Sequence, residues 1–247
     1  MCLVKLEVIL IQFLTIALVL LCIAYKRKSS APLIAMCLLF IAFSFDEILL
    51  ALPHVSLFSG LHWNWQGKIF QSLWPFILVY CLKWLAPKEL GFVSPKYAMS
   101  YFYSGLFAVF FVGIAIFSSF YVGLPSVNDI NDETILYEFT LPGLGEELVF
   151  RGVFLAILNK YLRRQWSFLG VNFGWGAILV TFLFMTVHLI IYDAATNTMT
   201  LTDNFIFPLL AGVILVVIRE KTESIWPCVL FHNIANGLYF VTLMILI

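Results

Sequence analysis

Long apolar runs recur along almost the whole of this chain, and they limit the folds that it can adopt. About 20 consecutive apolar residues form a helix long enough to cross the hydrocarbon of a bilayer. Of the 247 residues, 62% are hydrophobic and only 11% are charged, whereas a soluble domain carries about a quarter charged residues. Too few polar side chains are present to cover a water-facing globule. We therefore predict an all-α, polytopic integral membrane protein with about eight transmembrane helices.

The predicted spans follow one another with short connections. They cover residues 3–24, 31–52, 68–86, 98–122, 134–158, 175–192, 204–218 and 225–246. The first run is long enough to span and lacks an obvious small-x-small cleavage site, so we interpret it as a retained helix and not as a signal peptide. No repeat, low-complexity tract or soluble linker divides the chain. We expect a single membrane domain, 1–247, in which residues 1–97 form N-terminal spans and residues 98–247 form the functional core.

The basic residues predict how the chain is oriented in the membrane. Eleven of the 14 Lys and Arg residues lie in four alternate loops, at Lys26, Arg27, Lys28, Lys83, Lys88, Lys96, Lys160, Arg163, Arg164, Arg219 and Lys221. The opposite loops include the acidic or neutral stretches 127–133 and 192–204, and the sequence His62-Trp63-Asn64-Trp65. Basic loops face the cytoplasm, so both termini are predicted outside, in a multi-pass protein of a prokaryotic cell membrane. Tryptophans beside a bilayer edge are usually interfacial anchors; a substrate gate is the alternative.

Charge and cysteine content exclude several other kinds of protein. The formal net charge is zero, so the charge gives no indication that the protein binds nucleic acid. We expect the chain to be surrounded by the lipid bilayer. The five cysteines are scattered and form no CxxC motif. This pattern argues against a disulfide framework and against a thiolate metal site. We interpret the cysteines as small packing residues.

Ionisable residues inside predicted spans are candidates for a functional site, because an unpaired charge in a bilayer costs several kcal/mol. The fifth span contains Glu146, Glu147 and Arg151. Glu147 and Arg151 are four residues apart and share a helix face, so we expect an ion pair. Glu146 points about 100° away. We expect it to lack a partner on its own helix, so that burial favours its neutral form unless another part of the bundle hydrogen-bonds it.

Two histidines lie within later spans and complete a polar set. His188 is placed well inside the sixth span, with Phe184 one turn below it. In the eighth span His232 and Asn236 are four residues apart and share a face. At 1.5 Å per residue, Glu146, His188 and His232 lie roughly 11–20 Å from the cytoplasmic ends of their helices. The sequence therefore predicts an intramembrane polar site shared by three helices.

These motifs resemble those of the CAAX-protease and bacteriocin-processing family, also called the Abi family. The resemblance rests on Glu-Glu-x-x-x-Arg, Phe-x-x-x-His and His-x-x-x-Asn, which occur in this order between residues 142 and 236. It also includes Pro142, Phe150-Arg151-Gly152 and Ser224-Ile225-Trp226-Pro227. Residues 1–97 carry no comparable match. The resemblance implies a glutamate-type intramembrane endopeptidase.

The resemblance also implies roles for individual residues. Glu146 would be the general base, and His188 would position the same water. His232 and Asn236 would donate hydrogen bonds to the oxyanion, for which an imidazole and an amide are suitable. Glu147, Arg151 and Phe184 would support the site. We expect no cofactor and no metal, although Glu146 with two histidines leaves a zinc site as an alternative; no HExxH sequence is present.

Two functions of other classes stay open at this point. A polar intramembrane cluster also occurs in transporters, where it binds ions or relays protons. The fold could equally serve as a non-catalytic scaffold or immunity protein. If the protein is an endopeptidase, its partner is a protein or peptide substrate with a membrane-associated segment, cleaved near its C-terminus or beside the membrane.

Overall fold

The computed structural model describes residues 3–53, 55–122, 130–193, 196–202 and 205–246, and the predicted loops 127–133 and 192–204 lie partly outside these ranges. Its longer helices are α1 (Leu3–Arg27), α2 (Ala31–Leu50), α3 (Trp65–Phe76), α5 (Ser100–Val122), α9 (Trp175–Leu189), α10 (Ile206–Thr222) and α11 (Trp226–Leu246). The shorter helical segments are η1 (Ser56–Phe58), η2 (Ile77–Cys81), α4 (Pro87–Leu90), α6 (Asp132–Glu138), α7 (Leu141–Glu147), η3 (Leu148–Phe154) and α8 (Leu155–Leu162). Helical segments occupy all eight predicted spans, which confirms the all-α membrane fold.

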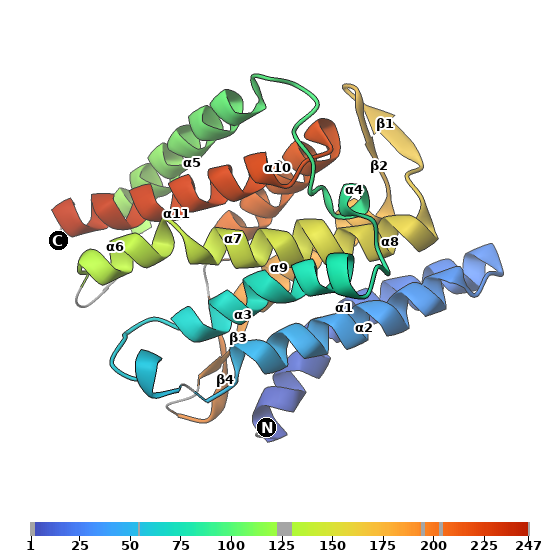
Figure 1. The fold of residues 1–247 in the computed structure, drawn as a ribbon, viewed down its shortest axis with the longest axis horizontal. Helices are drawn as coiled ribbons and strands as arrows, with labels where there is room; N and C mark the ends of the chain where they lie inside the picture. The colour runs from blue at the N-terminus through green and yellow to red at the C-terminus, as the bar shows by residue number, and fades with distance from the viewer. Residues whose placement is uncertain (1–2, 54, 123–129, 194–195, 203–204, 247) are drawn as a thin grey trace.

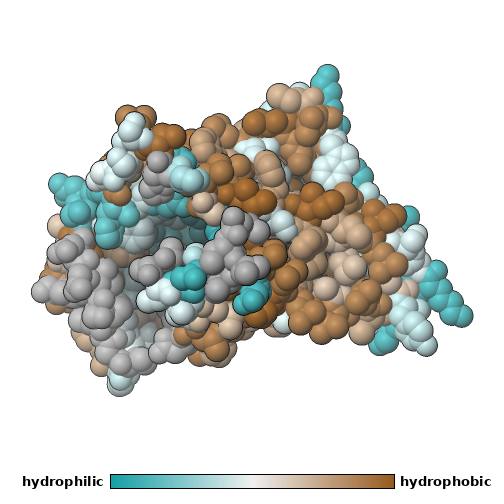
Figure 2. All heavy atoms as spheres, turned by 90° about the horizontal axis from the view of Figure 1, so that it is seen from below, coloured by the Kyte–Doolittle hydropathy of each residue, from teal (hydrophilic) through white to brown (hydrophobic). Residues whose placement is uncertain are grey.

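Apolar side chains cover much of the molecular surface, as a membrane protein requires. Within the described ranges, four helices (α1, α2, α5 and α11) are each long and apolar enough to cross a bilayer, and α9 is a shorter apolar helix. Figure 2 shows hydrophobic side chains over the right-hand part of the face seen from below. Hydrophilic side chains gather around a hollow at the left-hand end of this face, the end at which Figure 1 draws α6.

The helices pack in two groups around a central run. In Figure 1 the continuous run α7–η3–α8 crosses the middle of the molecule, with α5 and α11 on one side and α1, α2 and α3 on the other. One apolar core joins α2, η3 and α9 through residues such as Phe43, Phe154 and Leu183. A second core joins α5 and α11 through Ala108 and Phe231. Side chains from residues 1–97 and from residues 98–247 therefore share one core; the predicted single domain itself stays a prediction.

The fifth predicted span, 134–158, is an interrupted helix. The chain turns at Phe139 and Thr140 between α6 and α7, and Pro142 lies in the first turn of α7. Proline is tolerated there because the first N–H groups of a helix have no partner within it. The run then widens into the π-helical segment η3 directly after Glu147, and such widened turns often accompany functional sites.

Two short β-hairpins, which the sequence did not predict, close the ends of neighbouring helices. Strand β1 (Trp166–Phe168) pairs antiparallel with β2 (Val171–Phe173), and β3 (Ile190–Asp193) pairs with β4 (Thr198–Leu201). The first hairpin turns at Leu169 and Gly170, whose φ angles are both positive, at 49° and 72°. Two successive positive φ angles match the twist of a tight hairpin.

Two predicted helix ends are corrected by the structure. The sixth span, 175–192, ends as a helix at Leu189, so His188 lies in the last turn of α9 and not well inside the helix. At the end of a helix the last carbonyl groups have no partner within the helix. The hydroxyl of Thr202 donates a hydrogen bond to one of them, the His188 carbonyl, at 2.7 Å. In the third span, 68–86, the helical part ends at Cys81.

Of the four cysteines that the structure describes, one is packed in the interior and three are exposed. Cys228 is buried and free, whereas Cys22, Cys37 and Cys81 are free and exposed on the protein surface. Cys2 lies outside the described residues. The prediction of internal packing is therefore correct for Cys228 alone among the four that the structure describes.

Candidate active site

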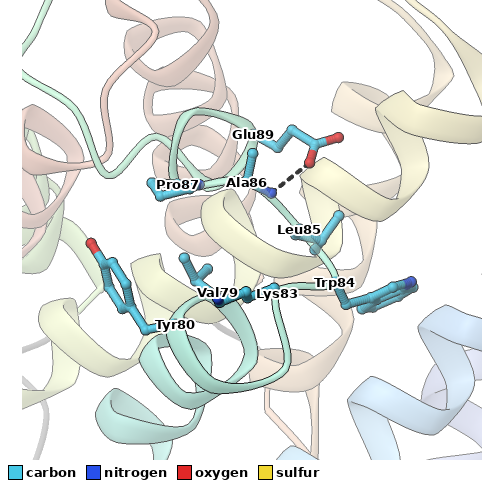
Figure 3. A pocket seen from close by; sticks show the side chains of 8 residues that line it. All are labelled: Val79, Tyr80, Lys83, Trp84, Leu85, Ala86, Pro87 and Glu89. Atoms are coloured by element: carbon cyan, nitrogen blue, oxygen red, sulfur yellow. Dashed lines mark hydrogen bonds between the residues drawn. The ribbon is translucent and has the colours of Figure 1, made fainter.

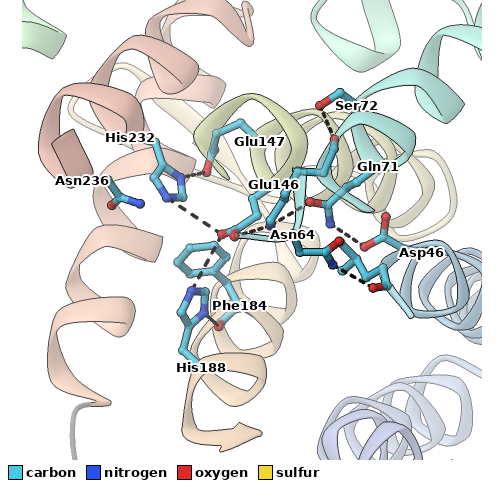
Figure 4. Close-up of polar contacts among 12 residues, drawn as sticks. Asp46, Asn64, Gln71, Ser72, Glu146, Glu147, Phe184, His188, His232 and Asn236 are labelled. Carbon is cyan, nitrogen blue, oxygen red and sulfur yellow. Dashed lines mark hydrogen bonds and ion pairs between the residues drawn. The ribbon is translucent and has the colours of Figure 1, made fainter. Parts of the chain in front are cut away.

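The predicted polar side chains converge where α7, α9 and α11 meet (Figure 4). Glu146 Oε2 lies 3.8 Å from His188 Nε2 and 3.9 Å from His232 Nε2. These distances are too long for direct hydrogen bonds, but each gap is of a length that a water molecule about 2.8 Å from both atoms would bridge. Glu146 Oε2 is buried and has no hydrogen-bond partner among the described residues. Both imidazole nitrogens thus lie within 4 Å of the same carboxylate oxygen.

Glu147 connects the predicted ion pair with His232. Its Oε1 lies 3.0 Å from Arg151 Nη1, and both side chains are fully buried. The same oxygen lies 2.8 Å from His232 Nδ1. The Arg151 guanidinium also lies 4.1 Å from the centre of the Phe184 ring, within the range of a cation–π contact. Glu147 therefore links His232 to Arg151, which packs against Phe184; the supporting role of these three residues stays a prediction.

The hydrogen bonds at the Nδ1 atoms define what each histidine offers at Nε2. His188 Nδ1 lies 2.8 Å from the carbonyl oxygen of Phe184. A carbonyl oxygen only accepts, so Nδ1 carries the proton and the neutral ring presents a lone pair at Nε2. His232 Nδ1 likewise donates to Glu147, whose carboxylate is paired with Arg151. His232 Nε2 can then donate a hydrogen bond only when the ring carries both protons.

Asn236 lies one helical turn beyond His232 and contacts a carboxylate that the sequence reasoning missed. Its Nδ2 donates to Glu138 Oε2 at 2.9 Å, and Glu138 is 5% exposed. An amide nitrogen has two N–H groups, so one remains for another acceptor. Glu138 belongs to the predicted span 134–158, and a carboxylate within a span was itself a signal of function.

Glu146 has its partner on another helix, the alternative that the sequence left open for this acid. Lys68 in α3 lies with its Nζ 2.7 Å from Glu146 Oε1 and also donates to Gln71 Oε1 at 2.9 Å. Both members of the ion pair are largely buried, with side-chain exposures of 13% and 15%. A nearby ammonium stabilises the ionised carboxylate. Lys68 occupies the first position of the predicted third span. A charge at this end of a span was the feature of the sequence that could have indicated a partner for Glu146.

The residues around this point do not fit a metal site well. Among the residues that the structure describes, no group of three or more His, Cys, Asp or Glu side chains is arranged to hold a metal ion. Three ligands of a tetrahedral zinc ion lie about 3.3 Å apart, closer than the 3.8 and 3.9 Å measured from Glu146 Oε2. In addition, the ammonium of Lys68 binds the other carboxylate oxygen and would repel a cation.

A separate surface pocket of about 450 Å³ lies in the segment between residues 79 and 89 (Figure 3). Its lining includes Tyr80, Lys83 and Trp84, and in it Glu89 accepts a hydrogen bond from the backbone N–H of Ala86 at 2.7 Å. None of the predicted site residues lines this pocket. The predicted motifs lie around Glu146 instead, so we take that cluster as the candidate active site.

Comparison with known proteins identifies one family. Residues 134–238 match the family described as type II CAAX prenyl endopeptidase Rce1-like. The matched segment contains Glu146, Glu147, Arg151, His188 and His232 together with Phe184 and Asn236. It confirms the resemblance to the CAAX-protease family that these motifs carry. Neither the comparison with curated proteins nor that with solved structures yields a match.

Proposed function

Because residues 134–238 match the family described as type II CAAX prenyl endopeptidase Rce1-like, we propose that this protein is an intramembrane endopeptidase. It hydrolyses a peptide bond near the C-terminus, or in a membrane-adjacent segment, of a protein substrate. The observation that carries this proposal is the approach of Glu146 Oε2 to the Nε2 atoms of His188 and His232, at 3.8 and 3.9 Å. One water molecule at their common point would contact all three groups.

The proposed reaction uses a water molecule as the nucleophile. Glu146 Oε2 accepts a proton from this water while the water oxygen attacks the carbonyl carbon of the scissile bond. The lone pair of His188 Nε2 accepts the second hydrogen bond of the same water and orients it. His232 in its doubly protonated form and the free N–H of Asn236 donate to the developing oxyanion. The accepted proton then passes to the leaving amine, which completes the hydrolysis.

The substrate can be sought without assuming its identity. We would compare the protein termini in membranes of cells that produce the wild-type chain with those from cells that produce Glu146→Gln, by mass spectrometry. An endopeptidase generates new termini that depend on Glu146. If identical termini occur in both samples while the protein still supports its cellular role, the chain acts as a scaffold or a transporter and the proposal fails.

We also propose that catalysis needs no metal. The expected result is that a chelator such as EDTA or 1,10-phenanthroline leaves the rate of terminus formation in purified membranes unchanged. Lys68 carries the positive charge beside Glu146, so no cation is required to stabilise the carboxylate there. The metal content of the purified protein is measured in parallel. One equivalent of zinc that is lost with activity on chelation, and restored with it on readdition, would contradict this mechanism.

The charge distribution supports an orientation for the proposed enzyme. With the basic loops in the cytoplasm, reporter fusions should be cytoplasmic at positions 28, 90, 162 and 221, and external at positions 60, 130 and 198. The helix α9 begins after the basic residues Arg163 and Arg164 and carries His188 in its last turn. The substrate segment would therefore reach the site from the outer side. An external readout at position 162 would contradict both the orientation and the side of access.

A further inference from the structure

The N-terminal helices contribute a chain of polar contacts that ends on Glu146 (Figure 4). Asp46 in α2 is 2% exposed, and both of its carboxylate oxygens accept hydrogen bonds. One bond comes from Gln71 Nε2 at 2.7 Å and the other from Trp74 Nε1 at 2.9 Å. The orientation of Asp46 is therefore determined by two donors of α3, and none of these residues lies in the segment that matches the family.

The direction of every bond in this chain follows from the chemistry of its members. The Asp46 carboxylate accepts, so the NH₂ group of Gln71 must face it, and the amide oxygen of Gln71 must face Lys68. That oxygen accepts from Lys68 Nζ at 2.9 Å, and Lys68 donates again to Glu146 Oε1 at 2.7 Å. Because Lys68 has two acceptors in fixed positions, its ammonium is held against one oxygen of Glu146.

Binding of Lys68 to one carboxylate oxygen of Glu146 leaves the other oxygen available to the histidines. Oε1 is bound by Lys68, and Oε2 is the atom that faces His188 and His232. Glu146 also interacts electrostatically with Glu47 in α2 and with Glu138 in α6, and these carboxylates repel one another when ionised. The ammonium of Lys68, 2.7 Å from Glu146 Oε1, opposes this repulsion. It can therefore determine both the rotation and the charge of this side chain.

We propose that Lys68, held by Gln71 and Asp46, is a positioning residue that orients Glu146 for water activation, so that α2 and α3 form part of the active site. The role in catalysis rests on the function proposed above. Lys68 does not touch the reacting point; it acts through Glu146. Residues 1–97 would then supply more than membrane spans, because they complete an active site whose other members lie between residues 134 and 238.

The test measures the state of Glu146 directly and cleavage separately. A hydrophobic carbodiimide such as dicyclohexylcarbodiimide reacts with protonated carboxyl groups, and mass spectrometry measures the rate of its addition to Glu146 between pH 5 and 9. In Lys68→Met the labelling should persist to higher pH than in the wild type, because the charge that stabilises the carboxylate is gone. Lys68→Arg keeps that charge and should resemble the wild type. Unchanged labelling in Lys68→Met would overturn the proposal.

Lys5→Met is the matched control, since Lys5 is a similarly buried lysine of the N-terminal helices, with a side chain 15% exposed, and pairs with Glu47 at 3.9 Å instead of with Glu146. It should leave the labelling of Glu146 by the carbodiimide as in the wild type. The double variant Lys68→Met/Glu146→Gln removes both charges and checks, by its thermal unfolding, that the fold survives without the pair.

The second readout is the yield of Glu146-dependent termini in membranes. We expect Lys68→Met to lower it by about 10²-fold, the size of effect that small misplacements of catalytic groups produce, with partial rescue in Lys68→Arg. Wild-type yields in Lys68→Met would overturn the positioning role even if the labelling shifts. If the wild type itself generates no termini, the proposed function fails, and the catalytic role of Lys68 fails with it. The carbodiimide labelling would still show whether Lys68 holds Glu146.

Discussion

Glu146→Gln should lower the rate of proteolysis by about 10²–10⁴-fold, the usual contribution of general acid–base catalysis, while the protein remains folded. The substitution keeps the volume of the side chain and its amide oxygen can still accept from Lys68, so the contact between α3 and α7 is preserved. It removes the negative charge and the proton acceptor that faces His188 and His232. The measurement is the rate at which new termini form in membranes that contain equal amounts of each protein.

The control for this prediction is the neighbouring acid. Glu147 is fully buried and bound to Arg151 and His232, so Glu147→Gln should lower the melting temperature and the yield of protein. Glu146→Gln should change the melting temperature much less. If Glu146→Gln retained activity and Glu147→Gln lost it without a loss of stability, the two acids would have the opposite roles. Full cellular function in Glu146→Ala would instead identify a non-catalytic scaffold.

Arg151→Leu should lower the free energy of unfolding by about 3–5 kcal/mol, because breaking a buried ion pair leaves one charge without compensation. The partner of Arg151 is Glu147, and neither side chain has any exposed surface. Arg151 Nη1 lies 3.0 Å from Glu147 Oε1. The substitution also removes the guanidinium above Phe184, 4.1 Å from the ring centre. Denaturant unfolding of the purified protein in detergent micelles measures the change.

Two controls test whether the loss of stability in Arg151→Leu comes from the buried charge that it leaves unpaired: a variant of a surface ion pair and a double variant. Lys96 and Glu223 lie 3.5 Å apart with side chains 56% and 48% exposed, so Lys96→Met should cost only about 0–1 kcal/mol. Replacing both Glu147 by Gln and Arg151 by Leu removes the stranded charge and should recover part of the stability. An Arg151→Leu variant as stable as Lys96→Met would contradict the assigned role of the pair.

Contacts within one helix were predictable from the sequence. Glu147 and Arg151 are four residues apart, and this spacing brings side chains together on any helix, even though the run widens directly after Glu147. The same spacing brings Phe184 next to His188, whose Nδ1 contacts the Phe184 carbonyl at 2.8 Å. The spans were predictable for a similar reason, since a bilayer imposes the length and the composition of each helix.

Contacts between helices were not predictable in this way. Lys68 and Glu146 are 78 residues apart, and Asn236 and Glu138 are 98 apart. Which of them meet depends on the rotation and crossing of α3, α6, α7 and α11, and the spacing of residues along one helix contains no information on this rotation. From the sequence alone, Glu146 was predicted to have no partner on its own helix, and neither Lys68 nor Glu138 was predicted as a member of the site.

The sequence by itself determined the membrane class of this protein, the approximate position of its helices, and the residues of the three motifs, because local periodicity and the thickness of a bilayer are sufficient for these. Only the tertiary structure decided how the motifs work together. Packing of α7 against α3 directs one oxygen of Glu146 to Lys68 and the other to the two histidines. Packing of α7 against α11 turns His232 so that Nδ1 contacts Glu147. Each of these orientations arises from side chains on different helices, and they exist only once the helices have packed.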